Sequence, residues 1–123
     1  KSKKYLNTHD FKAFKNKKSL FSMTAHIIYN QVDPINPATH SKKIIRLIRD
    51  KLVFKNLIMS DDISMKALKF NIVKNTKLAF TAGCNLVLHC NGNLSEMTLV
   101  AKNSPLIDKF ILKKTYKFYN IIS

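Results

Sequence analysis

Residues 57–61 read LIMSD, a short apolar run that ends on a carboxylate, and Asp62 adds a second carboxylate directly after it. Two other runs, residues 20–29 (LFSMTAHIIY) and 85–90 (NLVLHC), are apolar along nearly their whole length and do not alternate with polar residues. A strand that is buried on both faces has this pattern, and such strands are typical of parallel sheets. The sequence therefore predicts three parallel strands.

A helical pattern follows each of these runs. It is clearest over residues 41–52 (SKKIIRLIRDKL), where the apolar side chains form one stripe and the basic side chains lie elsewhere. Ser41 is a suitable N-cap for this helix, and Gly83 is suited to end a second one. The further helices are predicted over residues 72–82, 95–103 and 106–122. Alternating strands and helices indicate an α/β protein whose helices pack outside a parallel sheet.

The spacing of the runs indicates the larger fold to which they belong. Equivalent positions of successive runs lie ~30 residues apart, which is the length of one strand–helix unit. Three parallel strands alone would leave both sheet edges unpaired and would enclose little core. A complete (β/α)8 barrel needs about 250 residues. We therefore expect residues 1–123 to form a single partial domain, about three βα units of a (β/α)8 TIM barrel.

The charge of the chain permits two interpretations. With 22 Lys and Arg against 7 Asp and Glu, the formal net charge is +15, which favours an anionic partner such as nucleic acid or an acidic membrane surface. However, only Arg46 and Arg49 are arginines, and arginine is the residue that reads bases through bidentate contacts. The excess of Lys, Asn and Ile is typical of an AT-rich genome. We favour compositional bias, with neither a membrane nor a specific nucleic acid as partner, and keep a small basic nucleic-acid- or anionic-surface-binding protein as the alternative.

Several classes of site lack support in the sequence. It contains no GxGxxG, GxxxxGK[ST], HExxH or paired CxxC motif, and no apolar run approaches the roughly 18 residues of a membrane span. Cys84, His89 and Cys90 make a weak metal site because neighbours on a strand point to opposite faces. We expect two buried, reduced thiols, no metal and no cofactor. The basic N-terminal stretch also lacks the apolar segment of a secretory signal.

Asp61 and Asp62 are the strongest local chemical feature. Either carboxylate could cap a helix that starts near Ile63, which would make the pair structural. Alternatively, the C-terminal end of a barrel strand is the place where barrel enzymes hold their active sites. In that case Asp61 would project inward at the top of its strand, and Asp62 would face the surrounding helix. The residues alone do not separate these two interpretations.

Six blocks of the chain follow one another in a specific order. They are Met23-Thr24-Ala25-His26, Asp33-Pro34, Pro37-Ala38-Thr39, Phe54, Ser60-Asp61-Asp62-Ile63-Ser64-Met65-Lys66-Ala67-Leu68 and Ala82-Gly83-Cys84. In order and spacing, from about residue 9 to 108, the chain resembles the glycoside hydrolase family 3 β-N-acetylhexosaminidases. The Ser-Asp-Asp-x-Ser-Met block is the specific one, and Asp10-Phe11 and Phe14 resemble the segment that precedes the first block.

The resemblance implies the C-terminal portion of a (β/α)8 barrel that removes terminal N-acetylglucosamine with retention of configuration, usually in cytoplasmic peptidoglycan recycling. It makes Asp61 the nucleophile, which forms a covalent glycosyl-enzyme that water then hydrolyses. In this branch a histidine on a mobile loop, oriented by an aspartate, is the acid and base. That loop and the residues that grip the sugar are expected upstream of residue 1. Neither His9 nor His26 is assigned to the acid/base role, and His26 is interpreted as a packed or loop-orienting residue.

The sequence also departs from the family pattern. Val53 and Asn56 occupy positions where the family usually has glycine, and Asn85 stands where aspartate is usual. If residue 53 must adopt a left-handed conformation, its β-branched side chain would cost roughly 1–2 kcal/mol. These changes fit relaxed constraint on a remnant. We expect a carbohydrate substrate, an N-acetylglucosamine-containing muropeptide, and an inactive isolated chain. A separate chain is one way to supply the N-terminal part of the barrel.

Overall fold

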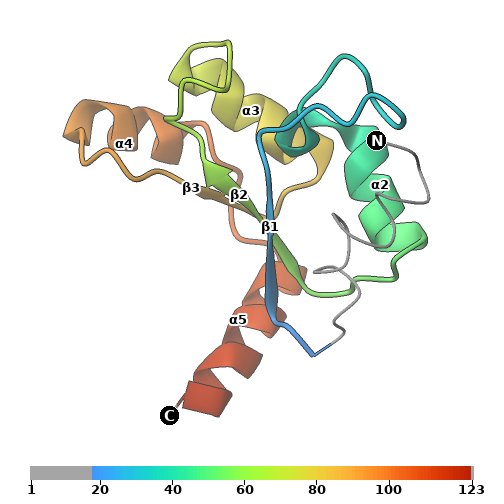
Figure 1. Cartoon of the computed structure of the whole chain (residues 1–123). Helices are drawn as coiled ribbons and strands as arrows, with labels where there is room; N and C mark the ends of the chain where they lie inside the picture. The colour runs from blue at the N-terminus through green and yellow to red at the C-terminus, as the bar shows by residue number, and fades with distance from the viewer. Residues whose placement is uncertain (1–17, 123) are drawn as a thin grey trace.

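The computed structural model describes residues 18–122, so the expected segment around His9, Asp10-Phe11 and Phe14 lies outside the described residues. Three strands form one parallel sheet in the order β1-β2-β3 (Figure 1). They are β1 (Phe21–Thr24), β2 (Leu57–Asp62) and β3 (Leu86–Leu88). The prediction of an α/β protein with three parallel strands is confirmed for this part of the chain.

Helices follow every strand, as the alternating pattern predicted. The 3-10 helix η3 (Ala38–His40) and α2 (Lys42–Asp50) follow β1, α3 (Ile72–Ala82) follows β2, and α4 (Leu94–Lys102) and α5 (Lys109–Ile122) follow β3. The hydroxyl of Ser41 accepts a hydrogen bond from the backbone N–H of Ile44 at 3.1 Å, which confirms the predicted N-cap of α2. The bounds of α3 are those predicted.

The main hydrophobic core lies between the sheet and the helices α2 and α3. Ile44, Ile45 and Ile48 form the apolar stripe of α2, and each is at most 4% exposed. They pack in one cluster with Ile58 of β2 and Ala79 of α3. The apolar stripe of α2 therefore faces a protein core. Burial of each side chain of this size stabilises the fold by about 1.5–3 kcal/mol. None of the helices within residues 18–122 has the length and apolar character needed to cross a membrane.

The side of the sheet that faces away from α2 and α3 is only partly covered, because Met59 and Leu86 are half-buried there and Met23 is exposed. The pairing register places Met23, Met59 and Leu86 side by side on neighbouring strands, and we call these three residues the open face. Met23 is 45% exposed. Figure 1 shows α5 at the opposite end, where the strands begin, and there the ring of Phe118 meets the ring of Phe21 edge-on at 5.3 Å.

Some boundaries differ from the prediction for physical reasons. The first strand ends at Thr24 and not at residue 29, because the backbone leaves the sheet there: His26 lies in a bend, and the carbonyl of Ile27 accepts a hydrogen bond from the N–H of Ala38 at 2.8 Å. The strand β3 has 3 residues, fewer than predicted. The last helix begins at 109 and not at 106, because the carboxylate of Asp108 accepts a hydrogen bond from the N–H of Ile111 at 2.8 Å and caps the helix.

Two residues adopt a positive φ where helices end. Gly83 has a φ of 121° after α3, and a Cβ there would lie 2.7 Å from the Cγ2 of Ile45, so the predicted helix end requires glycine. Val53 has a φ of 53° after α2. This is the left-handed conformation for which a cost was predicted. Asn56 does not need a positive φ; its side chain donates to the carbonyl of Ser19 at 2.6 Å.

Candidate active site

Asp61 and Asp62 are the last residues of β2 and lie at the end of the sheet where all three strands finish (Figure 1). Ile58 and Ser60, on the helix side of β2, are fully buried, whereas Met59 belongs to the open face. Alternation along a strand would return the next side chain to the open face. However, the pairing of β2 with β3 is irregular between Met59 and Asp62, and bulges re-aim side chains. The two carboxylates are therefore distinguished by their contacts.

Asp61 keeps one carboxylate oxygen available. Its Oδ1 accepts a hydrogen bond from the backbone N–H of Asp62 at 2.7 Å, which fixes the orientation of the carboxylate. Among residues 18–122, no donor forms a hydrogen bond with its Oδ2. The side chain is half-buried. An oriented carboxylate with a free oxygen is suited to attack an electrophilic carbon or to bind a hydroxyl group.

Asp62 differs from its neighbour because its carboxylate holds the surrounding chain together. Its Oδ1 accepts hydrogen bonds from the N–H of Ser64 at 3.0 Å, from the hydroxyl of Ser64 at 2.7 Å and from the N–H of Cys90 at 3.1 Å. Burial alone would raise the pKa of this carboxyl group, but the hydrogen bonds from Ser64 and Cys90 outweigh it and lower the pKa. Asp62 thus connects the end of β2 to the end of β3.

The helix-cap interpretation of the two carboxylates required a helix near Ile63. Residues 63–70 form turns and bends instead, and the next helix, α3, begins at Ile72 with the side chain of Asn71 as its N-cap. The helix-cap interpretation is therefore wrong for both carboxylates. Asp62 caps a turn, and Asp61 caps nothing beyond the adjacent peptide N–H.

His26 connects the ends of β1 and β2. Its Nε2 donates to the carbonyl oxygen of Asp62 at 2.7 Å, since a carbonyl can only accept. Its Nδ1 lies 2.8 Å from the hydroxyl of Thr39, which itself lies 2.9 Å from the hydroxyl of Thr24. Both ring nitrogens are engaged by the protein. His26 lies in a bend after β1 and is half-buried, so of the two roles expected for it, packed or loop-orienting, its contacts support the loop-orienting one.

Thr39 is a supporting residue that the sequence did not single out by itself. It is fully buried in η3. Its hydroxyl forms hydrogen bonds with the side chains of Thr24 and His26 and with the carbonyl of Ala25. A buried hydroxyl needs such partners. The signal that could have revealed it is its place in the Pro37-Ala38-Thr39 block, directly before a predicted helix.

The two cysteines lie in different environments. Cys84 is buried, and burial raises the pKa of its thiol to about 12, so this thiol is inert as expected. Cys90 is exposed beyond the end of β3, and the prediction of a second buried thiol is therefore wrong. Nε2 of His89 lies 3.8 Å from the carboxylate of Glu96. Across residues 18–122, no three His, Cys, Asp or Glu side chains gather as metal ligands.

A family model covers almost the whole chain. The Glycosyl hydrolase family 3 N terminal domain, which has a TIM-barrel-like fold, matches residues 2–115. The chain belongs to this family. The resemblance that rested on the Ser-Asp-Asp-x-Ser-Met block is therefore confirmed.

Individual relatives agree with the family match. A β-hexosaminidase from Psychromonas ingrahamii is 31% identical over 121 residues, covering 93% of this chain and 34% of that protein. One from Nitrosomonas eutropha is 43% identical over 72 residues, covering 56% of this chain and 20% of that protein. The crystal structure of native NagZ from Neisseria gonorrhoeae superposes with a TM-score of 0.71 at 28% identity, covering 94% of this chain and 34% of that chain. The chain thus spans about a fifth to a third of the length of these relatives.

Proposed function

We propose that this chain is the C-terminal portion of a β-N-acetylhexosaminidase barrel and supplies its nucleophile, Asp61. The observation that carries the proposal is the contrast between two adjacent carboxylates at the end of β2. Oδ1 of Asp62 accepts three hydrogen bonds from Ser64 and Cys90, which tie this side chain to the chain around it, whereas Asp61 accepts only one hydrogen bond, from a peptide N–H. Barrel enzymes hold catalytic groups at this end of their strands. The relatives' name, β-hexosaminidase, supplies the reaction class.

In the proposed reaction, Asp61 acts on the anomeric carbon of a terminal N-acetylglucosamine. A carboxylate oxygen forms a bond to that carbon while the glycosidic C–O bond breaks, and the leaving oxygen takes a proton from a general acid. The same group, now a base, removes a proton from water, which attacks the anomeric carbon and releases the sugar from Asp61. Two displacements at one carbon retain its configuration. The N–H of Asp62 orients the attacking carboxylate beforehand.

We place the general acid outside the described residues, because the family resemblance puts it on a mobile loop upstream of residue 1, and the environments of His26 and His40 agree with this. His26 has both ring nitrogens engaged. His40 is buried, and burial together with the nearby His26 lowers its pKa, which disfavours the protonated form that an acid needs. The acid/base histidine, its orienting aspartate and the sugar-gripping residues would then belong to the remainder of the barrel, upstream of residue 1 or on a separate chain.

The sheet supports the need for such a remainder. Among residues 18–122, the outer edges of β1 and β3 have no neighbouring strand, and the open face of Met23, Met59 and Leu86 would become part of the barrel interior. Closing a barrel pairs every edge. By family, we propose an N-acetylglucosamine-containing muropeptide as substrate and cytoplasmic peptidoglycan recycling as the process.

Complementation tests this proposal. The part of the Nitrosomonas eutropha relative that precedes its match would be co-expressed with the 123-residue chain, and hydrolysis of an aryl N-acetyl-β-glucosaminide measured. Asp61→Asn should lower the rate by at least about 10³-fold, and Asp62→Asn should lower it much less. The matched control is Asp50→Asn, which removes an exposed carboxylate of α2 and should not change the rate.

Two results would contradict the proposal. Equal losses from Asp61→Asn and Asp62→Asn would remove the nucleophile assignment. An assembled but inactive wild-type pair would favour a non-enzymatic remnant of the family. Retention of configuration is checked separately by following the anomer first released, using NMR.

A further inference from the structure

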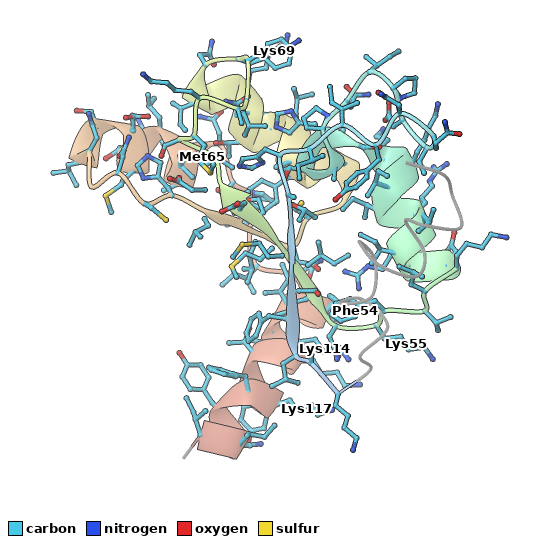
Figure 2. All side chains as sticks on the ribbon, viewed as in Figure 1. Phe54, Lys55, Met65, Lys69, Lys114 and Lys117 are labelled. Atoms are coloured by element: carbon cyan, nitrogen blue, oxygen red, sulfur yellow. The ribbon has the colours of Figure 1, made fainter. Side chains whose placement is uncertain are left out.

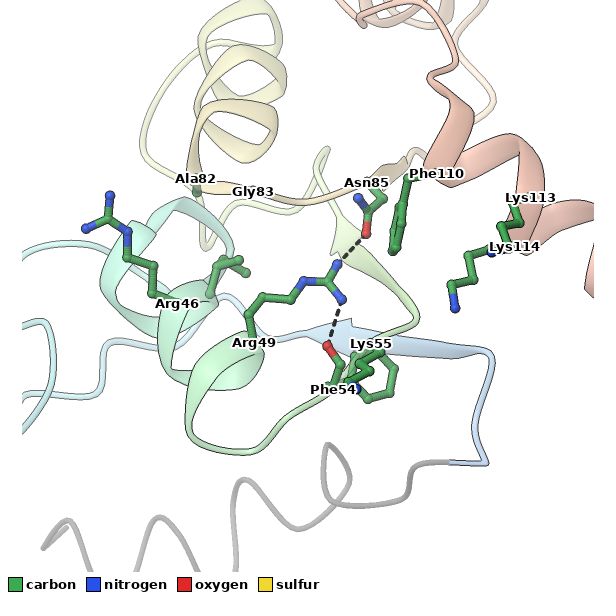
Figure 3. A pocket seen from close by; sticks show the side chains of 11 residues that line it. Arg46, Arg49, Phe54, Lys55, Ala82, Gly83, Asn85, Phe110, Lys113 and Lys114 are labelled. Atoms are coloured by element: carbon green, nitrogen blue, oxygen red, sulfur yellow. Dashed lines mark hydrogen bonds between the residues drawn. The ribbon is translucent and has the colours of Figure 1, made fainter.

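A second charged site lies at the end of the sheet opposite to Asp61. An open cavity of about 750 Å³ is bounded by α2, by the segments that precede β2 and β3, and by α5 (Figure 3). Five of its lining side chains are cationic and none is anionic; they are Arg46, Arg49, Lys55, Lys113 and Lys114. Figure 2 shows Lys55 and Lys114 on this lower side of the molecule, with Met65 and Lys69 on the upper side.

Arg49 carries a positive charge into this cavity without an anionic partner. Its Nη1 donates to the carbonyl oxygen of Phe54 at 2.9 Å, and its Nη2 donates to Oδ1 of Asn85 at 2.7 Å (Figure 3). Nη1 also donates to the carbonyl oxygen of Asn56 at 2.6 Å. All three acceptors are uncharged. Among residues 18–122, no carboxylate forms an ion pair with Arg49. The guanidinium is half-buried, and burial lowers its pKa, so its charge is only partly compensated.

Lys114 approaches the same region from α5. Its Nζ lies 5.7 Å from the centre of the Phe110 ring, and Cζ of Arg49 lies 5.6 Å from the same ring, so one aromatic ring contacts both cations. Burial, followed by repulsion from four neighbouring cations, lowers the pKa of Lys114. A bound anion would relieve this repulsion.

We propose that this cavity binds a phosphate group between Arg49, Lys55 and Lys114. The lining of the cavity takes Arg49 from α2, Lys55 from the loop before β2 and Lys114 from α5, and an anion with several acceptor oxygens can bind several such donors better than a single carboxylate does. The apolar lining of Ile45, Ala82 and Phe110 leaves room for the organic part of a phosphate monoester. Inorganic phosphate and a monoester share this chemistry. The site does not depend on the glycosidase proposal, because it contains none of the residues near Asp61.

Calorimetric titration of the 123-residue chain tests the site, with inorganic phosphate and phenyl phosphate as probes at constant ionic strength. We expect one saturable site per chain. Lys114→Gln should weaken binding about tenfold, because one charge-assisted hydrogen bond is lost. The matched control is Lys69→Gln, which removes the same charge from an exposed lysine on the other side of the molecule and should leave the affinity unchanged. Tighter binding of phenyl phosphate would indicate a monoester, and equal affinities would indicate the free ion.

Asn85→Asp provides a second test that a folding defect cannot imitate. The new carboxylate would occupy a position already 2.7 Å from Nη2 of Arg49, so it should form an ion pair with the guanidinium. The melting temperature should therefore rise, and phosphate binding should be lost. This variant and Lys114→Gln change the net charge by the same amount. Undiminished binding by Asn85→Asp would overturn the proposal. An equal loss with Lys69→Gln would also overturn it, because binding would then reflect diffuse charge.

Discussion

Nε2 of His26 lies 2.7 Å from the carbonyl oxygen of Asp62, which is 36 residues away along the chain. The backbone N–H of Asp62 in turn donates to the carboxylate of Asp61. A residue after β1 therefore holds the peptide group that directly follows the one whose N–H orients the proposed nucleophile at the end of β2. Thr39, on the other side of the ring, extends this hydrogen-bonded unit to η3.

Removing the imidazole should destabilise this unit. His26→Phe leaves the carbonyl of Asp62 without its donor, and we expect the free energy of unfolding to fall by about 1–3 kcal/mol. Thr39→Val replaces the hydroxyl with a methyl group and so removes its hydrogen bonds. Because the two side chains touch, their effects should be coupled by at least about 0.5 kcal/mol in a double-mutant cycle. Urea denaturation of the four proteins measures this coupling, and strictly additive effects would contradict it.

The environment of Asp33 predicts how the free energy of unfolding depends on pH. Asp33 is 3% exposed; its Oδ2 accepts a hydrogen bond from the hydroxyl of Ser41 at 2.6 Å, and its Oδ1 accepts from the N–H groups of Ile35 and Asn36 at 3.1 Å each. Burial alone would raise the pKa of this carboxyl, but the hydrogen bonds lower it from 3.8 to about 2. Because the folded-state pKa lies below the unfolded one, Asp33 stabilises the fold above about pH 4.

This contribution should be lost as the pH falls from 4 through 2. A shift of this size corresponds to about 2 kcal/mol of unfolding free energy. Asp33→Asn should lose that amount at pH 7 and should show a flatter acid limb than the wild type between pH 4 and 2. Urea unfolding at a series of pH values measures both quantities. Asp50→Asn, which changes an exposed carboxylate, is the control and should reproduce the wild-type limb.

Val53 offers a stabilising substitution. Its φ of 53° is unfavourable for a β-branched residue, and its side chain is 38% exposed, so little packing depends on it. Val53→Gly should raise the free energy of unfolding by about 1 kcal/mol, since relief of strain exceeds the greater entropy that glycine loses on folding. Lys51→Gly is the control. Lys51 has a φ of −86°, so glycine relieves no backbone strain there, and this substitution should lower the free energy of unfolding. A lower melting temperature for Val53→Gly would show that the position is not strained.

The sequence predicted the features that depend on local chemistry. The cap at Ser41, the helix end at Gly83 and the bounds of α3 follow from residues within a few positions of each other. It did not predict the end of β1, because residues 25–29 have the composition of a strand. Contacts with distant residues take the chain out of the sheet after Thr24: His26 binds the carbonyl of Asp62, and the carbonyl of Ile27 binds the N–H of Ala38.

Features that depend on distant segments were not predictable. The different roles of Asp61 and Asp62 depend on the N–H of Cys90, which β3 brings to Asp62. The cationic cavity was missed because it exists only when α5 places Lys114 near Arg49. Its one sequence signal was Asn85, an uncharged residue where the family usually has an aspartate.

The isolated chain should not hydrolyse a natural glycoside, and the choice of substrate can show why. A sugar or alkyl leaving oxygen needs a proton as the bond breaks, and a general acid typically contributes 10²–10⁴-fold. An aryl N-acetyl-β-glucosaminide with a very acidic phenol needs no such proton. Turnover of that substrate alone, and its loss in Asp61→Asn, would mean that the nucleophile is positioned and only the acid is missing. No turnover of either substrate would mean that substrate positioning also depends on the rest of the barrel. Robust hydrolysis of a natural substrate would show that an acid lies within these 123 residues, and the partial-barrel interpretation would be wrong.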